Sequence, residues 1–177
     1  SLGAKGVLNR KDFNCWGQLP TVNGPEFADY MKESRKFGKA IWEYTGKKDV
    51  DIVFEHPGES TFPVSVFCVK RGGMVVICAG TTGFNLTMDA RFLWMRQKRV
   101  QGSHFAHLKQ ASAANDLVIN RRIDPGMSEV FSWADIPAAH DKMLDNKHLP
   151  GNMAVLVTSP KPGLRTVEDV LEVSGQI

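Results

Sequence analysis

The sequence has little cysteine and no long hydrophobic run. Three of its 177 residues are cysteines, Cys15, Cys68 and Cys78, and they lie far apart. This small, odd number argues against a disulfide framework and favours a reducing compartment, the cytoplasm. The longest apolar run, residues 74–79, is far shorter than the ~20 residues of a membrane-spanning helix. We therefore expect no membrane span, and the polar first residues predict no signal peptide.

Several motifs of nucleotide and ester chemistry are also missing. The sequence holds no G-x-G-x-x-G fingerprint, no P-loop and no G-x-S-x-G elbow. The spacing of His, Cys and Asp does not resemble a metal site, so no metal is expected. With 22 Lys and Arg against 19 Asp and Glu, the net charge is only +3. A nucleic-acid binder typically carries a denser basic stripe, and we expect no nucleic-acid partner.

Apolar segments with strand and helix character alternate along the chain. The patterns predict helices over residues 26–44, 61–70, 88–98, 107–121, 136–146 and 167–173. They predict strands over residues 6–9, 51–55, 74–79, 99–103, 130–133 and 153–157. Strands that are apolar on both faces are typical of a parallel sheet covered by helices. The predicted class is therefore α/β with a Rossmann-like parallel sheet flanked by helices.

Small and polar residues follow three of the predicted strands, at residues 55–58, 80–83 and 102–105. Ligands of open α/β sheets bind beyond the carboxyl ends of the strands. Small residues would let a flat cofactor approach the backbone, and hydroxyls and amides could hold its polar groups. Ordinary turns are the alternative. His56 and His104 are the candidate functional histidines, and His104 is favoured because it follows Gly-Ser at a strand end.

Two basic groups are candidates for binding phosphates. The first shares one side of the predicted helix 26–44 and comprises Lys32, Arg35, Lys36 and Lys39. The second is interleaved with Phe92 and Trp94 and comprises Arg91, Arg96, Lys98 and Arg99. Arginine or an aromatic ring can stack on adenine while other cations pair with phosphate. A solvated helix face is the alternative for each residue.

Residues 54–115, 10–20 and 148–157 closely resemble the crotonyl-CoA carboxylase/reductase family, within the medium-chain dehydrogenase/reductase superfamily. These enzymes reduce an α,β-unsaturated acyl-CoA with NADPH and add CO2, giving ethylmalonyl-CoA from crotonyl-CoA in the ethylmalonyl-CoA pathway. The resemblance implies a fragment that is inactive alone. Residues 1–140 would form a partial NADPH-binding Rossmann domain without its first βα phosphate-loop unit. Residues 141–177 would form a strand and tail that return to the catalytic domain.

The resemblance also implies roles for individual residues. His104 would contribute to the CO2 pocket through an ordered water. The NADPH contacts would come from the turns after the strands, namely Glu55, His56, Ala79, Gly80, Thr81, Ser103 and Phe105. The CoA nucleotide would meet Arg91, Phe92, Phe67 and either Arg35 or Lys36, with Arg71 at an interdomain or intersubunit position. A homodimer or homotetramer is implied, through edge strands near residues 74–80 and 99–103.

Two other functions stay open at this point. A simple enoyl-CoA or acrylyl-CoA reductase would protonate the enolate instead of carboxylating it. A non-catalytic nucleotide- or CoA-binding module would lack the reaction altogether. The ratio of carboxylation to reduction after changing His104 separates the two enzymes.

Overall fold

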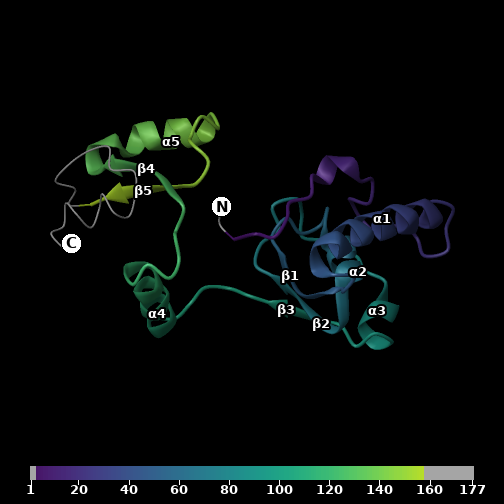
Figure 1. Cartoon of the computed structure of the whole chain (residues 1–177). Coiled ribbons are helices and arrows are strands. Elements are labelled where there is room, and N and C mark those ends of the chain that lie inside the picture. Colours follow the sequence, from purple (N-terminus) through teal and green to yellow (C-terminus); the bar gives the residue numbers. More distant parts are fainter. Residues whose placement is uncertain (1–2, 158–177) are drawn as a thin grey trace. The chain divides into compact units, whose positions relative to one another are not determined.

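A computed structural model describes residues 3–157 of the chain (Figure 1), so the helix predicted over residues 167–173 lies outside the described part. The chain divides into two compact units, unit 1 up to Phe105 and unit 2 from Ala106. Each unit has its own sheet, and both sheets are parallel. The predicted α/β class with parallel strands is confirmed. Among the described helices, none combines the length and the hydropathy that crossing a membrane requires.

The sheet of unit 1 has three strands in the order β1 (Val50–Glu55), β2 (Val69–Ile77) and β3 (Arg99–Gly102). Their register pairs Glu55 with Ile77 and Ile77 with Gly102. The last residues of all three strands therefore form one row. Every turn that follows a strand in unit 1 leaves from this single edge.

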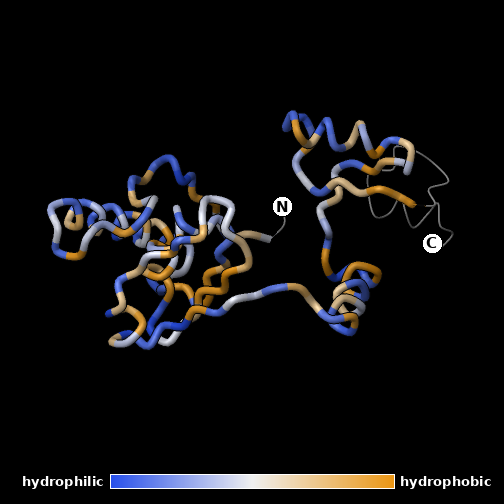
Figure 2. The backbone as a smooth tube through the Cα atoms, turned by 180° about the vertical axis from the view of Figure 1, so that it is seen from behind, coloured by the Kyte–Doolittle hydropathy of each residue, from blue (hydrophilic) through white to orange (hydrophobic). Residues whose placement is uncertain are grey.

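Helix α2 (Phe62–Cys68) is the central layer of unit 1, between the sheet and α1 (Phe27–Thr45). One set of its buried side chains packs on the sheet, in a cluster of Phe62, Val66, Val69 and Val75. The other set packs toward α1 and the amino-terminal segment, in a cluster of Phe13, Cys15, Tyr30, Val64 and Cys68. Each fully buried apolar side chain contributes about 1.5–3 kcal/mol. Figure 2 shows hydrophobic tube gathered at the strands of this unit.

Three predicted elements of unit 1 differ in the structure: the strand over residues 6–9, the helix over residues 61–70 and the helix over residues 88–98. Residues 6–9 form no strand, because no strand within the described residues pairs with them, and Val7 is 84% exposed. Residues 69–73, predicted as the end of a helix and a glycine stop, belong to β2 instead. The register shifts there between Val50 and Ile52 of β1, and Gly73 lies so close to β1 that an added Cβ would meet the Asp51 carbonyl at 2.8 Å. The bulge keeps this sequence in the sheet.

The helix predicted over residues 88–98 is much shorter in the structure. Helix α3 spans only Ala90–Trp94. The Asp89 side chain caps its start by accepting from the Arg91 N–H at 3.0 Å. Gln97 adopts a left-handed backbone with φ of 51°, which is incompatible with a continuing helix. The chain then turns Lys98 inward before β3.

Unit 2 contains α4 (Leu108–Ile119), β4 (Met127–Ser132), α5 (Ile136–Leu144) and β5 (Asn152–Leu156). Short 3-10 turns, η1 (Arg10–Asp12) and η2 (Trp133–Asp135), complete the elements of the two units. Strands β4 and β5 pair only with each other within the described residues, and α5 packs on β4. The assignment of residues 141–177 to a returning segment stays a prediction.

Candidate functional site

The turns after β1 and β2 interlock at the carboxyl edge of the sheet. Thr82 donates from its N–H and its hydroxyl to the Pro57 carbonyl, at 2.9 and 2.8 Å. The Ser60 N–H donates back to the Thr82 hydroxyl at 3.0 Å. Gly58 has φ of 87°, and a Cβ on it would lie 2.8 Å from the Gly80 Cα. The two turns therefore act as one platform, whose close contact requires glycine.

The turn after β3 joins the same edge. The Ser103 N–H donates to the Ile77 carbonyl at 2.8 Å, which extends the ladder past the strand. His104 and Phe105 follow with ring centroids 3.9 Å apart, and Phe105 is 90% exposed. His56 and Thr81 are exposed at the neighbouring turns, and Ala79 and Gly80 are half-buried. The predicted gathering of the three turns at one edge is confirmed, and the ligand roles of their residues stay predictions.

Glu55 serves the fold with its side chain. It is 2% exposed, and its Oε1 accepts from the Gly58 N–H at 2.9 Å and the Thr61 hydroxyl at 2.6 Å. Its Oε2 accepts from the Ser65 hydroxyl. The carboxylate thus fixes the first turn of α2, where unpaired N–H groups favour a negative charge. The side chain is thus used inside the fold, and the NADPH contact predicted for Glu55 stays a prediction.

A pocket of about 360 Å³ lies among α1, α2, α3 and the start of β3. Its five cations come from three stretches of the chain, and its lining includes Arg35, Lys39, Arg71, Arg96, Lys98, Trp42, Phe67, Phe92 and Asp49. A neighbouring pocket shares Arg35, Arg71, Phe92 and Arg96 and adds Arg91. Residues predicted to meet the CoA nucleotide from separate parts of the sequence therefore converge. We call these two adjoining pockets the basic pocket.

Aromatic rings and an ion pair shape the basic pocket. Phe67 and Phe92 pack edge to face, with centroids 5.9 Å apart. The Arg91 guanidinium donates to both oxygens of buried Asp89, with Nε–O distances of 2.9 and 3.0 Å. These bonds lower the pKa of Asp89 and raise the pKa of Arg91. The pair holds Arg91 at the start of α3 with its side chain 48% exposed.

Lys36 lies outside the lining of the basic pocket. Its Nζ donates to the Asp12 carbonyl at 2.9 Å and lies 5.2 Å from the centroid of the Phe13 ring. It also pairs with Glu33 at 3.7 Å. Arg35 and Lys36 were the two alternatives for the basic residue of α1. Arg35 lines the pocket, whereas the Lys36 side chain contacts the amino-terminal segment. Spacing on one helix could not separate these neighbours.

All three cysteines are thiols, and two of them belong to the core. Burial raises the pKa of Cys15 to about 11 and that of Cys68 to about 12. Both therefore stay protonated at neutral pH and pack as small apolar groups. Cys78 is half-buried at the end of β2.

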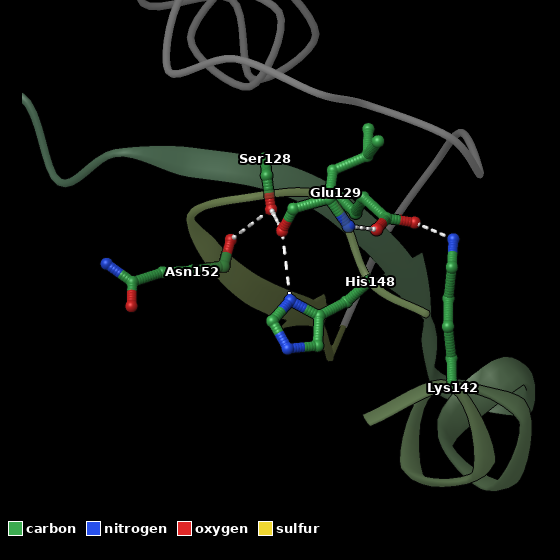
Figure 3. Close-up of polar contacts among 6 residues, drawn as sticks. Ser128, Glu129, Lys142, His148 and Asn152 are labelled. Carbon is green, nitrogen blue, oxygen red and sulfur yellow. Dashed lines mark hydrogen bonds and ion pairs between the residues drawn. The ribbon is translucent and has the colours of Figure 1, made fainter. Parts of the chain in front are cut away.

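Unit 2 carries a polar network that the sequence patterns did not indicate (Figure 3). Glu129 of β4 accepts from Lys142 of α5 and from the Leu149 N–H, the latter at 2.7 Å. The ring of His148 contacts the Leu149 carbonyl at 2.9 Å, and Ser128 donates to the same carbonyl at 3.3 Å. The Lys142 contact lowers the pKa of Glu129. The network fastens the segment between α5 and β5 onto β4, which is a structural role.

Comparison with known proteins identifies the family. The sequence profile of a family described as zinc-binding dehydrogenases matches residues 23–120, more than half of the chain. The chain belongs to the zinc-binding dehydrogenase family. The match runs from the start of α1 through the strand edge and the basic pocket to the end of α4, so both candidate sites lie inside the family region.

Individual curated proteins resemble the chain more closely than the family profile alone indicates. The chain is 73% identical over 172 residues to the crotonyl-CoA carboxylase/reductase of Cereibacter sphaeroides, covering 97% of this chain and 40% of that protein. It is 40% identical over 166 residues to the crotonyl-CoA reductase of Streptomyces avermitilis, covering 93% of this chain and 36% of that protein. The chain thus spans about two fifths of the length of these curated relatives.

Solved structures show the same likeness. A crotonyl-CoA carboxylase/reductase superimposes with a TM-score of 0.85 and 74% identity, covering 96% of this chain and 40% of that one. The crotonyl-CoA carboxylase/reductase AntE, in complex with NADP, gives 0.83 and 44%, covering 90% and 40%. The carboxylase reductase CinF, in complex with NADP and 2-octenoyl-CoA, gives 0.73 and 33%, covering 95% and 36%. The Rossmann-like assignment is therefore confirmed.

The name of the dehydrogenase family refers to zinc, which binds to a defined set of donor side chains. A zinc site needs at least three His, Cys, Asp or Glu side chains around one point. Within residues 3–157, no such group of three exists. The described residues therefore do not fit zinc.

Proposed function

We propose that this chain forms the nucleotide-binding part of an NADPH-dependent reductive carboxylase that converts crotonyl-CoA and CO2 to ethylmalonyl-CoA. The observation that carries the proposal is the presence of two different candidate sites in unit 1. One is a strand edge of small and polar turns, and the other is a pocket of cations and aromatic rings. The 73% identity to a protein of this activity supports the pairing of NADPH with an acyl-CoA.

The strand edge fits a dinucleotide. Gly58 and Gly80 pack against each other without side chains between them, which holds the turns after β1 and β2 together as one edge. His56 and Thr81 are exposed beside them and offer hydrogen bonds to an amide or a ribose. When bound, NADPH supplies a hydride to the β-carbon of the unsaturated acyl-CoA. The residues of this edge bind the cofactor and fix the direction from which it faces the substrate.

The basic pocket fits the nucleotide end of CoA. That part of the substrate carries several phosphate charges and an adenine ring. Arg35, Arg71 and Arg96 would pair with phosphates, since guanidinium groups form strong charged hydrogen bonds to them. The Phe67 and Phe92 rings would pack on the adenine. Binding at this remote end would hold the acyl group in a fixed position for reaction.

His104 would act on CO2 at the strand edge. Hydride addition leaves an enolate, whose carbon must meet CO2 before it meets a proton. A few fixed hydrogen bonds suffice to position CO2, and His104 would contribute through an ordered water. Its place directly after β3 brings it to the edge proposed for NADPH.

A chimeric enzyme tests this proposal. This chain replaces the matched 40% of the Cereibacter sphaeroides enzyme, and NADPH oxidation with crotonyl-CoA is measured together with incorporation of labelled CO2. We expect a chimera that oxidises NADPH and forms ethylmalonyl-CoA, and an isolated chain that does neither. A folded but inactive chimera would contradict the proposal, as would robust NADPH oxidation by the isolated chain.

His104→Asn in the same chimera separates carboxylation from simple reduction. We expect a lower ratio of ethylmalonyl-CoA to reduced butyryl-CoA, because CO2 would be positioned less well. His56→Asn is the matched control at the neighbouring turn. An unchanged ratio in the His104 variant would favour a simple enoyl-CoA reductase.

The same proposal includes a homodimer or homotetramer in the cytoplasm. Strand β3 is exposed along its whole length and pairs only with β2 among the described strands, so its outer edge can accept a second copy. The three thiols suit a reducing compartment. The mass of the assembly in solution, measured by light scattering, tests the oligomeric state.

A further inference from the structure

A buried lysine stands at the wall of the basic pocket. Lys98 is 8% exposed and precedes the first residue of β3. Its Nζ donates to the carbonyls of Val66 and Phe67 at 2.7 and 2.8 Å. Both carbonyls belong to the last turn of α2, where backbone acceptors lack partners inside the helix. The ammonium therefore closes the carboxyl end of α2.

The same ammonium reaches the helix on the other side of the pocket. It lies 4.9 Å from the centroid of the Phe92 ring of α3, within the range of a cation–π contact. The Lys98 backbone N–H also donates to the Phe92 carbonyl at 3.5 Å. Lys98 thus ties α3 to α2, and with them the two rings, Phe67 and Phe92, that meet edge to face.

We propose that Lys98 is a positioning residue for the CoA nucleotide, which sets the spacing of the Phe67 and Phe92 rings and keeps a positive charge at the wall of their pocket. This inference rests on the proposed function, because it takes the basic pocket as the CoA site. An ammonium has three N–H donors, and two of them bond the α2 carbonyls. The side chain also lines the pocket, so the ammonium keeps its charge beside the space where the nucleotide would lie.

The charges around Lys98 make its protonation sensitive to pH. It shares the pocket with Arg35 and Lys39 of α1, Asp49 before β1, Cys68 of α2, Arg71 of β2 and Arg96 before β3. Burial, and then Arg96, lower the pKa of Lys98 from 10.5 to about 8, although Asp49 and Cys68 act in the opposite direction. The ammonium therefore loses its proton over a range in which an exposed lysine keeps it.

The effects of this titration on the fold and on binding have opposite signs. Between pH 8 and 10.5 the unfolded chain binds more protons at this lysine than the folded one. The contribution of Lys98 to folding stability therefore rises with pH. A polyanionic ligand favours the ammonium, so affinity falls over the same range. A residue that served the fold alone would not weaken binding while it stabilised the protein.

The test measures the dissociation constant of crotonyl-CoA for the full 177-residue chain by calorimetry, at pH 7 and pH 9.5. An acyl-CoA has no titrating thiol, so the ligand does not add a group of its own near pH 8. For the unmodified chain we expect roughly tenfold weaker binding at pH 9.5, with a midpoint near pH 8. A dissociation constant that does not change with pH would overturn the role of Lys98.

Variants separate this role from a loss of folding. Lys98→Met should weaken binding roughly tenfold at pH 7 and remove the pH dependence. Lys98→Arg should restore affinity at pH 7 and stay independent of pH, because guanidinium does not titrate. Lys36→Met, which removes a cation outside the pocket, should change nothing. Unchanged affinity in a folded Lys98→Met chain contradicts the inference, whereas an unmodified chain that does not bind crotonyl-CoA contradicts the proposed CoA site itself.

Discussion

The two ends of helix α2 are held by buried charges of opposite sign. At the amino end, Glu55 accepts from Gly58, Thr61 and Ser65, beside the strand edge. At the carboxyl end, Lys98 donates to Val66 and Phe67, beside the basic pocket. Each charge suits the helix terminus that it meets. One short helix therefore supports both proposed nucleotide sites.

The two ends differ in what surrounds the charge. The Glu55 carboxylate accepts three hydrogen bonds, all from its own turn and helix, so both of its oxygens are used inside the fold. Lys98 borders an open pocket together with several other cations. Burial disfavours its charge, as its lowered pKa shows. The amino end is thus built for stability, and the carboxyl end keeps a charge that a ligand would use.

Removing the carboxylate at the amino end of α2 should have the largest effect on the free energy of unfolding. Glu55→Ala leaves a backbone N–H and two hydroxyls near the strand edge without their acceptor. We expect a loss of about 3 kcal/mol in the free energy of unfolding, measured by urea denaturation. Glu55→Gln keeps the size of the side chain and should cost about half as much. Equal stability of both variants and the unmodified chain would show that the cap is not needed.

The close contact of the turns at the same end gives a second, smaller effect. Gly58 and Gly46 both have left-handed backbones, with φ of 87° and 68°. An added Cβ would meet two backbone atoms at 2.8 Å at Gly58 and nothing within 4 Å at Gly46. Gly46→Ala should cost about 1 kcal/mol, the penalty of the conformation alone. Gly58→Ala should cost roughly 2 kcal/mol more, because the turns must separate.

The two glycine variants together also test whether the turns after β1 and β2 touch. Equal melting temperatures for the two alanine variants would mean that the turns after β1 and β2 do not touch as the structure has them. In the chimeric enzyme, Gly58→Ala should raise the KM for NADPH more than the KM for crotonyl-CoA. The reverse order would place NADPH elsewhere than the strand edge.

The strand edge could be predicted from the sequence, because parallel strands deliver their carboxyl ends to one side and the small residues follow each strand. The convergence of the basic pocket was not visible in periodicity. Its cations come from four stretches of chain, and only packing around α2 brings them together. The roles of individual buried residues were harder to predict than the position of either site. In the sequence, Glu55 is one of the polar residues at a strand end and Lys98 is part of a basic run, yet both are buried.

The errors in the elements have the same physical origin. The run before residue 74 has the composition of a helix end, but pairing with β1 places it in the sheet. The basic run after Trp94 has helical spacing, but its lysine is used to close α2, so the helix ends early. Long-range partners decided both cases. A local pattern contains no information about such partners.

The smallest effect should come from the exposed side of the basic pocket. Arg91 is held by Asp89 but remains 48% exposed, so its contribution to ligand binding is screened by water. Arg91→Ala in the chimeric enzyme should raise the KM for crotonyl-CoA about fivefold, near 1 kcal/mol, and leave the KM for NADPH almost unchanged. Lys36→Ala, which removes a cation of the adjoining surface, should change neither value. If Arg91→Ala leaves the KM for crotonyl-CoA unchanged, the CoA contact predicted for Arg91 is wrong. The positive charge that binds CoA beside the carboxyl end of α2 would then come from the other cations of the pocket alone.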